Sequence, residues 1–385
     1  MQKIRWFIAL MLVTLVMAAC AAPAAAPADG GSDDSAAETT GESAVEPAAE
    51  LTPVRLQLQW VTQSQFAGYY AAKELGFYEE EGLDVTILEG AVEIVPQQVV
   101  AAGDAQFGVA WVPKMLASRE RARTWLTSRR SSSGAAPSVS WADSGLESPE
   151  DWAGKRIGTW GFGNEWELYA ALRQAGIEPD DPNQVTIVQQ PFDMSLLLNR
   201  EVDAAQAMIY NEYAQVLEAT NPETGELYQP EDLTVIDYND VGTAMLQDHV
   251  FARGEWLEDE ANQDIAERFL RATFRGWIHC RDNVDECVDI VLDNGPTLGE
   301  GHMRWQLNEI NALIWPSPNG IGVMDDDLYQ QTVDISVDFA VLSAAPDDAA
   351  VRTDLAEAAL AGIEDVDTTG EGFEKLEVEV TPGGE

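Results

Sequence analysis

Aromatic side chains stand directly after several of the predicted β-strands. They are Trp60, Trp111, Trp160, Phe162, Phe192 and Tyr210. The carboxyl ends of parallel strands meet at one edge of a sheet, so these rings would gather there. Core packing explains most aromatic residues in most proteins, but it does not explain why they recur at one kind of position. The pattern therefore predicts a site in which a flat ligand ring stacks between aromatic side chains.

Polar side chains follow the same strand ends and would hydrogen-bond the edge of such a ring. They are Asn164, Glu165, Asp193, Asn211, Glu212 and Asp240. A carboxylate that faces an aminopyrimidine can bind its edge through two hydrogen bonds. Glu212 is our first choice for that role. The alternative is a solvated glutamate that stabilises the start of its own helix.

A glycine-rich turn at residues 161–165 separates a predicted strand from a predicted helix. It has no Lys-Ser/Thr pair, as a P-loop needs, and too few glycines for a dinucleotide fingerprint. Free backbone N–H groups before a helix still bind polar ligand edges, so Gly163 joins the candidates, unless the turn is only a tight connection. The three histidines, His249, His279 and His302, fit no catalytic or metal-binding spacing. We therefore expect no catalysis, no metal and no cofactor.

Alternating strands and helices must position these side chains. Residues 54–58 alternate as a strand does, 66–75 have helical spacing up to Gly76, and 85–88 form a second strand. In this βαβ unit Trp60 and Gln65 follow the first strand, where open α/β sheets bind ligands. We predict further strands at 106–110, 155–160, 185–189, 204–208, 234–237 and 249–252, and helices at 96–102, 165–175, 194–198, 210–219 and most of 261–363. The alternation predicts an α/β fold with largely parallel sheets.

The start of the chain resembles a secretion signal. Lys3 and Arg5 precede an apolar run that is short for a membrane span. Residues 17–20 resemble a bacterial lipobox, so we expect a signal peptide at 1–19 and a lipid on Cys20, unless that cysteine is incidental. Residues 21–50 contain no aromatic side chain, which predicts a disordered tether over 20–52.

The rest of the chain is large and acidic. Roughly 330 residues remain, more than one core usually holds, so we expect two lobes. The net charge of −45 makes nucleic acid an improbable partner, because that partner needs a basic face. The same charge opposes an anionic ligand unless a local Arg or Lys offsets it.

Two cysteines remain after Cys20, namely Cys280 and Cys287. On one unbroken helix they would lie about 10 Å apart, too far for a disulfide. A helix break at residues 281–283 would bring them together, and an exported protein permits the bond. The sequence leaves a disulfide and two buried thiols equally open.

Residues 119–137 interrupt the pattern of strands and helices. They hold five of the 22 basic residues and show no useful periodicity. One interpretation is a solvated basic loop. The other is a local frameshift. Codons can be chosen for residues 122–137 that, when read from the third base, encode Ala-Asp-Leu-Val-Asn-Ile-Ala-Gln-Ile-Phe-Gln. That stretch is apolar and β-branched at its centre, which suits a buried strand. The gene sequence tests this hypothesis, under which the first lobe lacks a core strand.

The motifs at residues 59–70, 76–85 and 102–108 resemble solute receptors of ABC importers, in the alkanesulfonate and thiamine-pyrimidine class of periplasmic binding proteins. The resemblance covers about 54–330 and implies two α/β lobes joined by a hinge, 54–145 plus 250–375 and 146–249, that clamp a ligand between them. It implies an importer permease as partner, a monomer, and lipid anchoring outside the cytoplasm. The opening motif adds four candidate ligand-binding residues, Gln65, Phe66, Gly68 and Tyr69.

The candidate site residues are acidic, amide and aromatic, which favours a neutral or cationic heteroaromatic ligand. We expect a thiamine pyrimidine precursor, such as hydroxymethylpyrimidine or formylaminopyrimidine. Riboflavin and alkanesulfonates are the alternatives within the class. The class also resembles thiamine pyrimidine synthases, but residues 160–164 contain no cysteine and no histidine precedes His249. An enzyme is therefore the less favoured interpretation.

Overall fold

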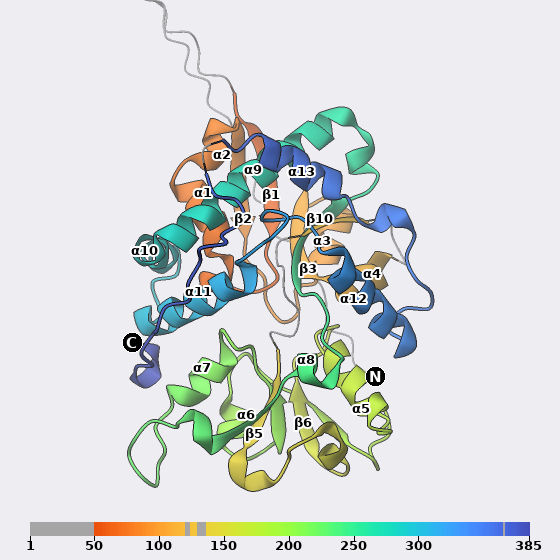
Figure 1. The fold of residues 1–385 in the computed structure, drawn as a ribbon, viewed down its shortest axis with the longest axis vertical. Coiled ribbons are helices and arrows are strands. Elements are labelled where there is room, and N and C mark those ends of the chain that lie inside the picture. Colours follow the sequence, from red (N-terminus) through yellow and green to blue (C-terminus); the bar gives the residue numbers. More distant parts are fainter. Residues whose placement is uncertain (1–49, 120–123, 129–135, 365) are drawn as a thin grey trace, which may run out of the picture. The chain divides into compact units, whose positions relative to one another are not determined.

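The computed structural model describes residues 50–119, 124–128, 136–364 and 366–385, with only the backbone at 124–128. All of them belong to one unit of the chain, residues 49–385 (Figure 1). The predicted signal peptide, Cys20 and most of the predicted tether lie outside the described residues. Within the described part, no helix has the length and hydropathy that a membrane crossing requires.

The first sheet has the strand order β2–β1–β3–β10–β4. Its strands are β1 (Thr52–Gln57), β2 (Leu83–Leu88), β3 (Phe107–Trp111), β4 (Thr124–Ser128) and β10 (Asp248–Arg253). β1 is parallel to β2 and β3, whereas β10 is antiparallel to β3 and β4. The strands predicted at 54–58, 85–88, 106–110 and 249–252 are confirmed. β4 falls in the segment for which the sequence predicted no regular element, and the frameshift hypothesis concerns residues that lie largely outside the described part.

The second sheet has the order β7–β6–β8–β5–β9. Its strands are β5 (Ser138–Trp141), β6 (Arg156–Thr159), β7 (Thr186–Gln189), β8 (Ala204–Gln206) and β9 (Leu233–Ile236). β6 is parallel to β7 and β8, and β5 is antiparallel to β8 and β9. Because β5 belongs here, the boundary between the halves lies before residue 138, not at the predicted residue 146. A four-residue strand beside the basic segment gave too short a pattern to be predicted.

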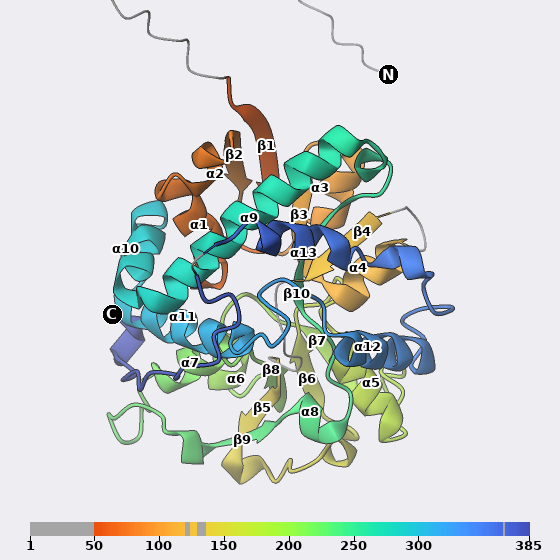
Figure 2. The same ribbon diagram turned by 45° about the horizontal axis from the view of Figure 1, so that its top comes forward.

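Helices flank both sheets. Those of the first half are α1 (Ala67–Glu74), α2 (Phe77–Glu80), α3 (Pro96–Ala102), α4 (Val112–Arg119), α9 (Glu260–Asp282), α10 (Val284–Asn294), α11 (Glu300–Ile314), α12 (Asp326–Asp338) and α13 (Thr353–Ala361). Those of the second half are α5 (Trp166–Gln174), α6 (Ser195–Leu198), α7 (Glu212–Leu217) and α8 (Tyr238–Val241). Figure 2 shows α9 beside α1 and α13 over the first sheet, where Phe269 of α9 stacks on Phe107 of β3 at 4.2 Å between ring centroids.

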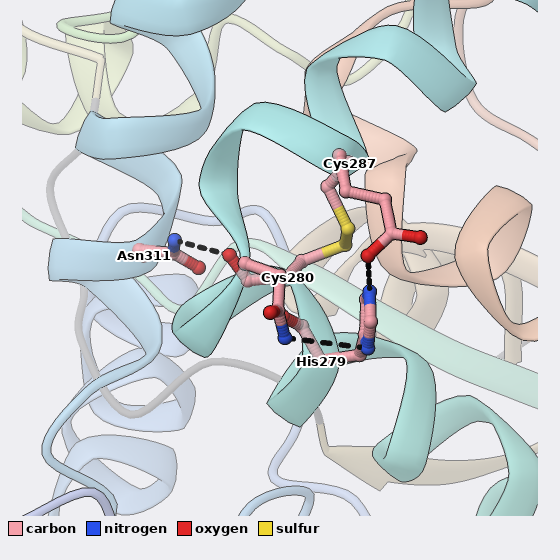
Figure 3. The surroundings of a disulfide bond; sticks show 6 residues. His279, Cys280, Cys287 and Asn311 are labelled. Carbon is pink, nitrogen blue, oxygen red and sulfur yellow. Dashed lines mark hydrogen bonds and ion pairs between the residues drawn. A yellow bond between two sulfur atoms is a disulfide. The ribbon is translucent and has the colours of Figure 1, made fainter.

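Cys280 and Cys287 form a disulfide, with their Cα atoms 5.3 Å apart (Figure 3). The helix break that the sequence suggested is present, because α9 ends at Asp282 and α10 begins at Val284. Asn311 of α11 donates a hydrogen bond to the carbonyl oxygen of Cys280 at 3.1 Å. The disulfide therefore joins two consecutive helices that also pack against a third.

Candidate functional site

A small cavity of about 10 Å³ lies between the carboxyl edges of the two sheets. Its walls are formed by Trp60, Gln65, Trp111, Trp160, Phe192, Met208, Tyr210, Asn211 and Glu212. The first three residues follow β1 or end β3, and the others follow β6, β7 and β8. Parallel strands end together, which is why side chains distant in sequence meet at this point. Eight of these nine residues are among those that the sequence placed at the site, and Met208 is the exception.

Aromatic rings from both halves form most of the wall. Trp60 of the first half and Phe192 of the second have ring centroids 5.9 Å apart and planes tilted by 41°. The exposed fraction is 2% or less for each of three of them, Trp111, Trp160 and Tyr210. Such rings offer flat apolar faces to a ligand that is itself flat. The arrangement suits stacking of an aromatic ligand.

A buried amide network fixes Gln65 in the wall. Its Nε2 donates to Asp248 Oδ2 at 2.7 Å, and its Oε1 accepts from Gln63 Nε2 at 2.9 Å. Its backbone N–H donates to Gln306 Oε1 at 2.9 Å, and Gln306 in turn donates to Gln63. Buried polar groups that are satisfied in this way hold one geometry. Gln65 therefore helps to fix the shape of the wall.

Glu212 places a buried carboxyl at the opposite wall. It is the first residue of α7 and is 1% exposed. Oε2 accepts from the backbone N–H of Met208 and Oε1 accepts from Asn211 Nδ2, each at 3.0 Å. Burial raises the pKa of the carboxyl to about 7. Near neutral pH Glu212 therefore both accepts hydrogen bonds and, in its protonated form, donates one.

A buried lysine connects the halves beside the cavity. Lys114 on α4 has its side-chain carbons against Gly163 of the second half, where a Cβ atom would lie 3.0 Å from Lys114 Cγ. Burial lowers the pKa of Lys114 to about 8, while the charges of Glu165 and Asp248 oppose that shift. The contact closes the cleft on the side of α4.

Three predicted site residues lie in the core rather than in the cavity wall. All three are buried, and the ring of Tyr69 meets that of Trp277 of α9 edge to face at 6.0 Å. A Cβ atom on Gly68 would overlap the Trp277 ring. Gly68 and Tyr69 thus lie on the face of α1 that packs against α9, and Phe66 precedes that helix.

The N–H groups of the glycine-rich turn form hydrogen bonds within the turn itself. The N–H of Gly163 donates to Glu165 Oε2 at 2.8 Å, and the N–H of Asn164 donates to the carbonyl of Gly161 at 3.1 Å. Asn164 Nδ2 also bonds to Gly161. These N–H groups are therefore already used within the turn. Phe162 is 51% exposed, with a positive φ of 54°, and lies outside the cavity wall.

The two predicted aspartates also lie away from the cavity. Asp193 accepts a hydrogen bond from the N–H of Ser195 at 2.8 Å and thus stabilises the start of α6. Asp240 is exposed on α8. Each residue follows a strand, but neither lines the cavity.

Residues 63–287 match the model of the family described as NMT1/THI5 like. This match covers more than half of the chain. The chain belongs to the NMT1/THI5-like family.

Curated relatives of this family member have different roles. A formylaminopyrimidine-binding protein of Halalkalibacterium halodurans is 24% identical over 63% of this chain and 71% of its own. A 4-amino-5-hydroxymethyl-2-methylpyrimidine phosphate synthase of Legionella pneumophila is 29% identical over 64% of this chain and 74% of its own. The riboflavin-binding protein RibY of Chloroflexus aurantiacus is 26% identical over 77% of this chain and 84% of its own.

Solved structures show the same architecture. The periplasmic aliphatic sulphonate binding protein SsuA of Escherichia coli matches with a TM-score of 0.54 and 16% identity, over 77% of this chain and 90% of its own. The predicted α/β fold is thus confirmed as that of periplasmic binding proteins. The sheets are mixed and not largely parallel as predicted, because β10 and β5 run antiparallel to both of their neighbours.

Three positions in this NMT1/THI5-like chain matter although the predicted site omitted them. Met208 lines the cavity, and Lys114 and His302 join the halves beside it. Lys114 and His302 come from helices whose place at the cleft depends on tertiary packing. Among the described residues, no three His, Cys, Asp or Glu side chains gather as metal ligands would.

A second buried carboxyl holds the chain segment that crosses between the halves. Glu167 of α5 accepts hydrogen bonds from the N–H of Met245 at 2.7 Å and from Gln247 Nε2 at 3.2 Å. Burial raises its pKa to about 8 from 4.5. Between those values the native protein keeps a proton that the unfolded chain has lost, so stability falls as pH rises, by up to about 1.4 kcal/mol per pH unit.

Replacing Glu167 with glutamine is expected to flatten the pH dependence of stability between pH 5 and 8, because the amide cannot titrate. Urea unfolding at pH 5, 6, 7 and 8 measures the slope. The control is Glu201→Gln, an exposed carboxylate, which should keep the wild-type slope. An unchanged slope in the Glu167 variant would contradict the assignment.

Proposed function

We propose that this protein is the extracytoplasmic substrate-binding protein of an ABC importer, and that it captures a thiamine pyrimidine precursor. Hydroxymethylpyrimidine and formylaminopyrimidine are the candidate ligands. The cavity carries the proposal, because it combines five aromatic side chains with a buried carboxyl at the junction of two halves. Membership of the NMT1/THI5-like family and the formylaminopyrimidine-binding relative support it.

The cavity is closed to a small remnant in this structure. Pockets for drug-sized ligands measure about 300–1,000 Å³. The cavity here has a volume of about 10 Å³, so either candidate ring must enter after the two halves separate. A riboflavin-binding role, as the name of the Chloroflexus relative suggests, is the second candidate.

The charge of the cavity disfavours a sulfonate. An anion needs cationic or N–H donors around it. No Arg or Lys stands among the described residues of the wall, and Glu212 contributes a carboxyl. An aminopyrimidine instead offers a ring nitrogen and an exocyclic amine, and these complement a carboxyl that can accept and donate.

A receptor is favoured over a pyrimidine synthase. The described cavity wall contains neither histidine nor cysteine, the residue types of the synthase-like motif and active site. His249 lies on β10, where its Nδ1 bonds to the carbonyl of Gln247. We propose that the chain binds its ligand without breaking bonds in it and has no cofactor.

Closure of the two halves about a hinge completes the proposed mechanism. The ligand enters the open cleft, contacts the first half, and the second half rotates onto it. Asn211 and Glu212 then complete the wall. The closed form docks on the importer permease as a monomer, tethered to the membrane by the lipid on Cys20.

A thermal-shift panel tests the proposed ligand. Hydroxymethylpyrimidine and formylaminopyrimidine are each expected to raise the melting temperature by several degrees, since ligand at 100 times Kd adds about 2.7 kcal/mol. Riboflavin, taurine and thiamine are the comparison compounds. A shift with riboflavin alone selects the second candidate, and a shift with taurine alone contradicts a heteroaromatic ligand. Turnover of added pyridoxal phosphate would contradict the receptor role itself.

A further inference from the structure

The last residues of the chain run along α11 and end beside α7 (Figures 1 and 2). Asn308 of α11 pairs through its amide with the backbone of Leu376, with both hydrogen bonds at 2.9 Å. Beyond this point the segment crosses to the second half. Val380 packs against the apolar cluster of the second sheet, and the N–H of Gly383 donates to the carbonyl of Glu218 at 3.0 Å. We call residues 377–385 the C-terminal strap.

The end of the strap fits closely between the two halves. Gly384 is buried, and a Cβ atom there would lie 2.7 Å from His302 Cβ and 3.0 Å from Glu218 Oε2. A Cβ atom on Gly299 would overlap the carbonyl oxygen of Gly384. At Gly384 the strap therefore packs closely against the start of α11 and against Glu218, which follows α7.

His302 connects this contact to the cavity. Its Nδ1 lies 2.7 Å from Glu218 Oε1, and its Nε2 lies 2.7 Å from Asn211 Oδ1. Asn211 Nδ2 in turn donates to Glu212 Oε1. An unbroken series of hydrogen bonds thus leads from Glu218, which the strap holds, to the carboxyl in the cavity wall. Trp305 adds a bond from Nε1 to the carbonyl of Ile209 at 3.1 Å.

We propose that the C-terminal strap and His302 form a clamp that holds α7 against α11 and so positions Asn211 and Glu212 in the closed cavity. The inference rests on the proposed function, in which the halves separate to admit ligand. Separation of α7 from α11 must break the Gly383, His302 and Trp305 contacts together. The clamp therefore raises the population of the closed form, and apparent affinity follows the population of the binding-competent state.

Hydrogen exchange of the ligand-free protein tests the clamp independently of any ligand. A chain that ends at Leu376 loses the strap but keeps the Asn308 pairing and the ion pair of Lys375 with Glu309 at 2.5 Å. The amides of α7 are expected to exchange about tenfold faster in this variant, while those of β1 and β3 keep the wild-type rates. His302→Ala, with the full chain, is expected to act in the same direction.

The matched control is the double variant Glu377→Gln, Glu379→Gln. It removes charge from exposed strap residues without removing the strap, and it should exchange as the wild type does. Unchanged exchange of α7 in the shortened chain would overturn the proposal. So would an equal increase in β1 and β3, because that result indicates general loss of stability. Should the shortened chain fail to fold, Val380→Asp in the full chain gives the same readout.

Ligand binding provides the second measurement. The shortened chain is expected to bind the pyrimidine about tenfold more weakly, mainly through faster dissociation. Unaltered affinity together with faster exchange would overturn the link between the clamp and the cavity. If the wild type binds none of the panel compounds, the proposed function fails, whereas the exchange result still decides whether the clamp exists.

Discussion

Replacing Glu212 with alanine is expected to weaken binding of an aminopyrimidine by about tenfold to a hundredfold. The carboxyl is buried at the cavity wall, so water does not replace the lost hydrogen bonds. Each such bond between neutral partners contributes about 0.5–1.5 kcal/mol, and two are lost together. The N–H of Met208 and Asn211 Nδ2 also lose their acceptor. Isothermal titration calorimetry measures the loss directly.

The same carboxyl gives binding a definite pH dependence. Burial raises its pKa to about 7. The neutral acid donates to a ring nitrogen and accepts from the exocyclic amine, whereas the carboxylate only accepts. Above pH 7 the free protein must take up a proton to bind a neutral aminopyrimidine in this way, so affinity should fall by up to about tenfold per pH unit. Below that pH it should change little.

Two further variants separate the roles of Glu212. Glutamine also donates and accepts, so Glu212→Gln should retain more affinity than alanine and should lose the decline above pH 7. Asp240→Asn is the control, since Asp240 is exposed on α8 and should leave affinity unchanged. Wild-type binding by the alanine variant, or a pH profile that survives in the glutamine variant, would show that the carboxyl does not contact the ligand.

Replacing Gly276 with alanine is expected to cost about 3 kcal/mol of stability or more. Gly276 lies in α9 where this helix meets α1, and an added methyl group would overlap the carbonyl oxygen of Gly68 and lie 2.9 Å from the N atom of Ala72. These neighbours are atoms of the α1 backbone, which cannot move aside without disturbing that helix. In an exposed helix the same change stabilises the protein by up to about 1 kcal/mol. The sign of the stability change therefore shows whether the two helices are in close contact at Gly276.

Urea unfolding compares this variant with Gly372→Ala. Gly372 has no neighbouring atom within 4 Å of an added Cβ, so that change should alter stability by no more than about 0.5 kcal/mol. Equal stability of the two variants would mean that α1 and α9 do not approach each other as closely as the structure shows.

The sequence predicted the strand ends of the cavity well, because period-two patterns and terminal glycines are local signals. Trp111 ends β3 and Glu212 begins the helix that follows β8, so both could be placed at this edge. Phe66 and Gly68 show a limit of the same reasoning, because they do not line the cavity. A helical pattern shows that one face is buried, but not whether it faces a cleft or another helix.

Long-range packing accounts for the remaining differences. Lys114 and His302 reach the cleft only because α4 and α11 pack at its two sides. Strand β5 joins the second sheet through pairing with β8 and β9, which its four residues do not reveal. The sequence also left the state of Cys280 and Cys287 open, since only the geometry at Asn283 decides it.

The cavity wall divides recognition between the halves. The first half supplies Trp60 and Trp111 together with a Gln65 already bonded to its neighbours. The second half supplies three further rings, Trp160, Phe192 and Tyr210, together with Asn211 and Glu212. Under the proposed function both halves stack on a flat ring, and the second half also matches the donors and acceptors on its edge. Substitutions of Asn211 and Glu212 are therefore expected to redirect the protein to a different heterocycle, while the stacking surface of the first half stays as it is.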